Sequence, residues 1–138
     1  MKTLILTLTL ILSSLLGSAQ DKGQNITVTI DNVQGDKGKV SFALHTKDTF
    51  MKTAPVATLE TKIENGKVKV VFKDIEPGEY AILVLHDANE NGKMDFQENG
   101  MPLENFAASN NTMSYGPPQY SDAKFTLGAE DLKLNIRF

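Results

Sequence analysis

One twelve-residue stretch of the chain carries the side chains best suited to chemistry. It runs from Asp87 to Glu98 and matches the calcium-loop spacing D-x-[DN]-x-[DN]-G-x₅-E without a gap. Oxygen-bearing side chains at alternate positions converge on one point when the backbone curls, and oxygen ligands suit hard cations such as calcium. We therefore predict calcium as a cofactor, held by the following ligands: Asp87, Asn89, Asn91, Lys93 through its backbone carbonyl, Asp95 and Glu98.

The surroundings of this motif differ from those of a helix–loop–helix calcium sensor. Gly92 at position six permits the required sharp turn. A strand pattern leads into the motif, however, and Gly100 and Pro102 prevent a long exit helix. The expected site is thus a strand-to-loop site, in which Glu98 is the least securely placed ligand. The alternative is a polar loop in which Asn, Asp and Gly only form turns.

The chain has two histidines, His45 and His86, and each ends an apolar strand pattern. If they lay near one rim of the fold, they could form a metal or acid–base pair. The alternative function is then a small periplasmic hydrolase or isomerase that uses them with the loop carboxylates. A strand-end histidine is more often a hydrogen-bonded packing residue. Because no cysteine and no G-x-S-x-G motif accompanies them, we predict no enzyme and no catalytic residue.

The elements that must position these residues are short strands. The run 80–86 is apolar on both faces and is expected to be a central strand. Asn65-Gly66 between two alternating runs indicates a hairpin turn. Seven strands and no helix-period segment favour an all-β fold, a seven-stranded antiparallel β-sandwich of immunoglobulin or transthyretin type, with a small barrel as the alternative. The expected strands lie at 25–30, 40–45, 57–63, 68–72, 80–86, 123–127 and 132–138.

One long loop interrupts this spacing, over the 35 residues from Ala88 to Asp122. Such a loop must either contain local structure or be held by something else. Its second half carries four large side chains, which form an exposed surface for sugars or a partner, or fold back onto the sandwich as a small satellite cluster. They are Phe106, Met113, Tyr115 and Tyr120.

The first residues have the pattern of an export signal. Lys2 precedes an apolar run over 4–16, and the small residues Gly17 and Ala19 follow it. We predict a signal peptide at residues 1–19 and a single sandwich domain at 20–138. The run is shorter than the roughly 20 apolar residues of a membrane-spanning helix. We therefore expect an exported protein, periplasmic or extracellular, without a membrane span after cleavage; the alternative is an uncleaved anchor.

The composition restricts the classes of function. The 138 residues include no cysteine, which excludes disulfides, cysteine-ligated metal sites and thiol catalysis. The 14 basic and 17 acidic residues give a net charge of −3, which argues against nucleic acid as a partner. We expect a monomer.

Several segments of the chain are distinctive in sequence and order, namely 77–81, 86–95, 100–104, 109–111, 117–118 and 122–125. Together they resemble the secreted bacterial domain-of-unknown-function 2141 family. The resemblance implies an exported single domain of transthyretin or prealbumin type, with a D-x-N-x-N-G-K-x-D loop that Asp87 to Asp95 matches, and supplies no catalytic residue. We predict a non-catalytic binding or envelope module of unassigned role, with an envelope protein or glycan as partner.

Overall fold

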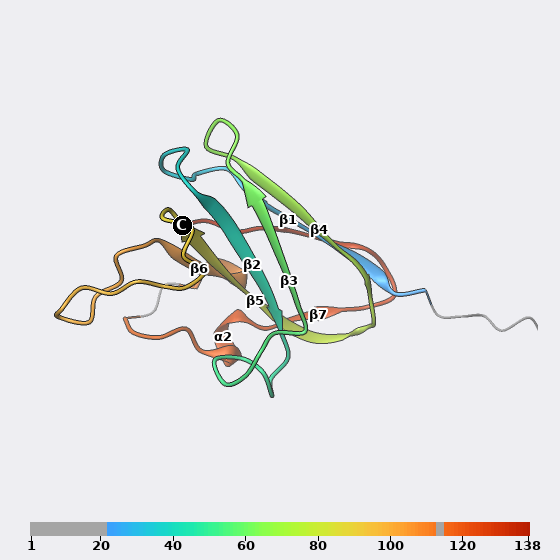
Figure 1. The fold of residues 1–138 in the computed structure, drawn as a ribbon. Helices are drawn as coiled ribbons and strands as arrows, with labels where there is room; N and C mark the ends of the chain where they lie inside the picture. The colour runs from blue at the N-terminus through green and yellow to red at the C-terminus, as the bar shows by residue number, and fades with distance from the viewer. Residues whose placement is uncertain (1–21, 113–114) are drawn as a thin grey trace, which may run out of the picture.

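Two β-sheets pack face to face in this computed structural model, which describes residues 22–112 and 115–138. One sheet has three strands and the other has five (Figure 1). The β-sandwich predicted from the alternating patterns is therefore confirmed. The predicted signal peptide at residues 1–19 lies outside the described residues, and so does Met113.

The three-stranded sheet has the order β4-β1-β8. Its members are β4 (Val68–Ile75), β1 (Gln24–Ile30) and β8 (Leu132–Asn135). Strand β1 is antiparallel to β4 but parallel to β8, so the sandwich is not antiparallel throughout. Alternate side chains of β1 are fully buried, as a strand with one face toward the core requires.

The five-stranded sheet has the order β3-β2-β5-β6, and β7 pairs with the first residues of β5. All of its pairings are antiparallel, and β5 is central, as its apolar sequence predicts. The strand β6 comes from within the long loop and was not predicted. The strands are β3 (Ala57–Lys62), β2 (Lys39–His45), β5 (Gly78–Asp87), β6 (Phe106–Ala108) and β7 (Phe125–Leu127).

The main core lies between the two sheets. Large apolar side chains from both sheets fill it, including Phe42 of β2 and Phe72 of β4. The Asn65-Gly66 turn has the positive φ values, 53° and 72°, that a tight hairpin turn needs. The hairpin signal nevertheless predicts only the turn. Beyond one bridge, Glu64 with Lys67, strands β3 and β4 separate into different sheets.

A satellite cluster covers the outer face of the five-stranded sheet. Phe50, Ala81, Ala108 and Ala123 form it, with Leu83 and Tyr120 packed against them. Tyr120 belongs to the short helix α2 (Tyr120–Ala123). This part of the long loop therefore folds back onto the sandwich as a satellite cluster, which is one of the two alternatives that the sequence left open. Phe106 and Tyr115 remain exposed.

Hydrogen bonds from Ser109 hold the helix α2 segment onto the sheet. Ser109 begins the 3₁₀ turn η1 (Ser109–Asn111) and is fully buried. Its Oγ accepts the Ile82 N–H at 3.0 Å and donates to the Ala123 carbonyl. The long loop thus contains local structure of its own, namely a strand, a 3₁₀ turn and a helical turn.

Candidate functional site

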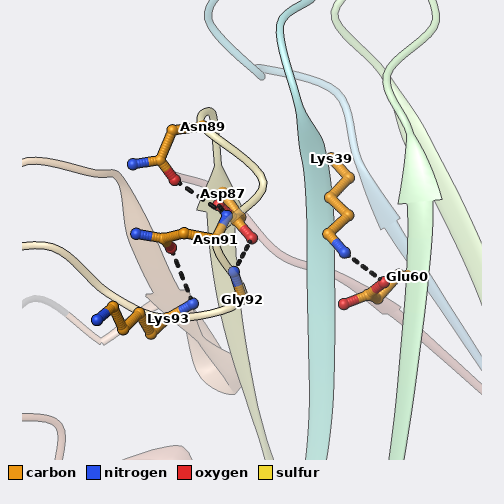
Figure 2. A network of polar contacts seen from close by, with 7 residues as sticks. All are labelled: Lys39, Glu60, Asp87, Asn89, Asn91, Gly92 and Lys93. Carbon is orange, nitrogen blue, oxygen red and sulfur yellow. Dashed lines mark hydrogen bonds and ion pairs between the residues drawn. The ribbon is translucent and has the colours of Figure 1, made fainter.

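The predicted calcium loop curls around the carboxylate of Asp87. Asp87 is the last residue of β5 and is only 1% exposed. Its Oδ1 accepts the Asn91 N–H at 3.1 Å, and its Oδ2 accepts the Gly92 N–H at 2.8 Å (Figure 2). Gly92 has a φ of 78°, a conformation that glycine adopts without a steric penalty. The curl expected from the motif is therefore present.

Two asparagines continue the curl and turn their amides toward a second carboxylate. The Oδ1 of Asn89 accepts the Asn91 N–H at 3.2 Å, and the Oδ1 of Asn91 accepts the Lys93 N–H at 3.1 Å (Figure 2). Both side-chain amides donate to one oxygen, Oδ2 of Asp95, at 2.7 Å each. Four of the predicted side chains are thus gathered in one small region, and Lys93 is held in the same curl through its N–H.

Glu98 lies elsewhere, because the chain after Asp95 forms a hairpin. Segment 95–103 doubles back through hydrogen bonds of 2.8 Å from the Gln97 N–H to the Met101 carbonyl and from the Leu103 N–H to the Asp95 carbonyl. A turn at 97–100 closes this hairpin, which projects from the sandwich (Figure 1, yellow-orange). Glu98 sits in that turn, is exposed, and makes no side-chain hydrogen bond within the described chain.

Glu104, which the motif does not include, occupies the place next to Asp95. Its Oε1 accepts the Ala88 N–H at 3.0 Å, and its Oε2 accepts the Asp95 N–H at 3.4 Å. One carboxylate therefore joins the beginning and the end of the curl. The only sequence signal for it is indirect. Gly100 and Pro102 prevent an exit helix and so make a chain reversal necessary.

Asp95, Asn89 and Asn91 carry carboxylate and amide oxygens, which are the kind of ligand that calcium prefers. No three His, Cys, Asp or Glu side chains in segments 22–112 and 115–138 are grouped closely enough to hold a metal ion. Calcium at this site would therefore need amide oxygens of Asn89 and Asn91 as well as carboxylates. A half-turn of a terminal amide exchanges its nitrogen and oxygen in nearly the same place. The residues thus fit a cation, at the expense of the bonds that these oxygens now make to backbone N–H groups.

The negative charge of the loop reaches the neighbouring strand. Lys39 on β2 forms an ion pair of 2.7 Å with Glu60 on β3 (Figure 2). The pKa of Lys39 is raised, chiefly by the hydrogen bond to Glu60, and the charges of Asp87 and Glu90 contribute in the same direction. The carboxylates of Asp87 and Glu90 thus add to the effect of Glu60 in keeping Lys39 protonated.

The two histidines lie at opposite ends of the sheet. In the antiparallel pairing of β2 with β5, His86 is opposite Val40 and His45 is opposite Ala81. Val40 and His45 are five positions apart on β2, which corresponds to about 17 Å of strand. The alternative in which they share one rim is therefore wrong, because β2 and β5 run in opposite directions, and the favoured interpretation as strand-end packing residues remains.

Each histidine has its own local hydrogen bond. The Nε2 of His86 donates to the Lys37 carbonyl at 2.9 Å. The Nδ1 of His45 lies 3.1 Å from the Thr49 hydroxyl, and its ring packs edge-on against Phe50. Burial lowers the pKa of His45. Both are buried packing residues, and the structure does not bring them together as a catalytic pair.

The fold and loop define the class of protein as a β-sandwich domain with an acidic, asparagine-rich strand-to-loop turn. Residues 28–135 match the family described as "Uncharacterized protein conserved in bacteria (DUF2141)". The chain belongs to this family, and the resemblance seen in the sequence is confirmed. Comparison with curated proteins and with solved structures gives no match. Within the part of the chain that the structure describes, no helix is long and apolar enough to cross a bilayer.

Proposed function

We propose that this protein is an exported, non-catalytic β-sandwich module in which calcium stabilises the loop from Asp87 to Glu104. The module acts in binding or in envelope structure, with an envelope protein or a glycan as its partner. One observation carries the proposal. Asn89 and Asn91 both direct their side chains to a single oxygen of Asp95, at 2.7 Å each, inside the curl that Asp87 starts. Export rests on the signal pattern at residues 1–19.

Calcium would relieve an electrostatic problem in this loop. The carboxylates of Asp95 and Glu104 belong to one short segment, in which Glu104 accepts the backbone N–H of Asp95 at 3.4 Å. Asp87 adds a third carboxylate, buried at the end of β5. A divalent cation supplies the opposite charge and fixes a long loop in a chain that has no cysteine for a disulfide.

The non-catalytic assignment is supported by the placement of the polar groups. His45 and His86 are held at opposite ends of the five-stranded sheet by separate hydrogen bonds. The buried hydroxyl of Ser109 is engaged by Ile82 and Ala123. The hydroxyl beside His45, that of Thr49, accepts the Thr46 N–H at 3.0 Å and is thus held in the turn after β2 instead of being presented as a nucleophile for acyl or glycosyl transfer.

Calcium should raise the melting temperature of the purified protein. Extracellular calcium modules bind at about 10⁻⁴–10⁻³ M. At about 10 mM calcium, mass action then stabilises the folded state by about 1.4–2.7 kcal/mol. For a domain of this size that corresponds to an increase of about 5–10 °C. Differential scanning calorimetry with calcium and with chelator measures the difference.

Asp95→Asn is the variant that tests the site. It keeps the size of the side chain and removes the charge on which the two amides converge. We expect it to fold and to melt at the same temperature with calcium and with chelator. A wild-type melt that is identical under the two conditions would refute the proposal. So would an Asp95→Asn variant with the full wild-type response.

A further inference from the structure

An apolar groove lies on the outer face of the five-stranded sheet. Its volume is about 520 Å³, within the range of about 300–1,000 Å³ that is usual for small-molecule sites. Strands β5 and β6 form its floor, and the hairpin 95–103 and the residue before it form one wall. The main lining side chains are Leu83, Leu85, Phe106, Met94, Phe96 and Pro102.

Several of these side chains are exposed although they are large and apolar. Phe96 and Met51 are each 59% exposed, and Phe106 is 39% exposed. Single exposed apolar residues are common, but these three line one groove. Large contiguous apolar patches on a protein surface commonly mark ligand-binding grooves or interaction sites.

A second hollow, of about 550 Å³, adjoins the groove and has a basic character. The two hollows share Met51, Pro117 and Pro118 in their walls. The second one is also lined by three lysines and one carboxylate. Lys124 pairs with that carboxylate, Glu79, at 3.2 Å.

The other two lysines, Lys47 and Lys52, form no ion pair in the described part of the chain. Burial and the charges of Glu79 and Asp48 raise the pKa of Tyr120 in this wall, so two carboxylates face the three lysines. In a protein with a net charge of −3, this end of the combined cavity keeps a small local excess of positive charge. It therefore favours an anionic group.

The basic end is held in place by packing. The Phe50 N–H donates to the Thr46 carbonyl at 3.0 Å, which makes the segment after β2 a helical turn. Phe50 in turn packs edge-on against Tyr120 of helix α2, with 5.6 Å between ring centroids. The turn that carries Lys47, Met51 and Lys52 is thus fixed relative to the opposite wall, so the cavity exists before any ligand binds.

We propose that the combined cavity binds a single-chain anionic amphiphile, such as a fatty acid. The hydrocarbon tail occupies the apolar groove, and the carboxylate lies at Lys47 and Lys52. A concave groove that ends at paired cations suits a molecule with one apolar and one charged end. This inference goes beyond the calcium proposal, because its cationic end contains no residue of the calcium loop; Met94, Phe96 and Pro102 of that loop line only the apolar end.

Calorimetric titration of the full chain with laurate tests the proposal. The titration is done below the micelle-forming concentration and in calcium-free buffer, because calcium precipitates the soap. The comparison ligands are dodecanol, which has the same chain without charge, and dodecyltrimethylammonium, which has the opposite charge. We expect saturable binding of laurate at least about tenfold tighter than that of either comparison ligand, since ion pairing adds to the burial of the tail.

Two double variants separate the charge from its position. Lys47→Glu/Lys52→Glu should abolish the preference for laurate over dodecanol. Lys69→Glu/Lys133→Glu makes the same change of net charge on the other sheet and should leave binding unaltered. Phe106→Ser should weaken laurate and dodecanol alike. Unfolding midpoints confirm that each variant is folded.

Three outcomes would overturn the proposal. One is no saturable binding of laurate. Another is equal binding of laurate and dodecanol that the Lys47→Glu/Lys52→Glu variant does not change. The third is association with anionic vesicles without any binding of monomeric laurate, which would indicate a membrane surface as the occupant instead.

Discussion

Asp87 forms the turn at the start of the loop with its side chain. Its carboxylate is buried and accepts two backbone N–H groups, so it forms the turn whether or not a cation is present. Leaving buried N–H groups without an acceptor costs about 1–3 kcal/mol. Asp87→Asn would thus disturb the fold of the loop as well as any metal site. Asp95 and Glu104, which lie at the edge of the curl, separate the two effects better.

His45 should make the protein less stable in mild acid. Burial lowers its pKa in the folded state below the ordinary value of about 6.5. The unfolded chain then binds the proton more readily, so stability decreases as the pH falls from about 6.5 toward the folded-state pKa. Urea unfolding midpoints at pH 7.5 and pH 5.5 measure the loss. His45→Gln should make it smaller.

His86→Gln is the matched control for this prediction. It removes the other histidine and keeps His45 with its Thr49 contact. The loss of stability between the two pH values should therefore persist in this variant. If His45→Gln retains the whole wild-type loss, burial of His45 is not its cause.

At the scale of elements, the hairpin 95–103 decides which carboxylate joins the loop. Positions Asp87, Asn89, Asn91 and Asp95 could be predicted from the sequence because their approach depends on a local curl with glycine at its sharpest point. Glu98 was predicted as a ligand because it occupies position twelve of the motif, a position that an exit helix normally directs toward the cation. The reversal that brings Glu104 back instead depends on pairing across the hairpin, which no local spacing encodes.

Gly38 should be essential to the start of the loop. It has a φ of 75°, and a Cβ there would overlap the carbonyl oxygen of Asp87 and the backbone of Ala88. Gly38→Ala should therefore displace the end of β5 and lower the free energy of unfolding by more than the roughly 1–2 kcal/mol of a positive φ alone. Urea unfolding measures the loss, and the melt should also lose its calcium response.

Gly35→Ala is the control for steric overlap. Gly35 has a φ of 81°, but a Cβ there has no neighbour within 4 Å. It should lose only about 1–2 kcal/mol and keep the calcium response. Equal losses in the two variants would mean that the contact of Gly38 with the loop has no structural importance.

At the scale of the whole molecule, the sandwich could be predicted because its strands alternate. Ile26, Val28 and Ile30 show their buried face directly in the sequence. The parallel pairing of β1 with β8 could not be foreseen, since it joins segments about a hundred residues apart. Strand β6 has three residues, too few to show a period, and forms because β5 offers an edge.

At this scale, the end of the five-stranded sheet and the hairpin 95–103 bring Glu104 to the loop and leave Glu98 outside it. We therefore expect the fold, and not the linear motif, to select the ligands of calcium. Calorimetric titration of calcium into Glu104→Gln and Glu98→Gln distinguishes selection by the fold from selection by the linear motif. The same chemical change is made in both variants. Glu104→Gln should weaken calcium binding by about 10–100-fold, and Glu98→Gln should leave it at the wild-type value. The reverse result, with affinity lost only in Glu98→Gln, would mean that the linear motif selects the ligands, and no calcium binding to the wild-type protein would mean that the loop is not a calcium site.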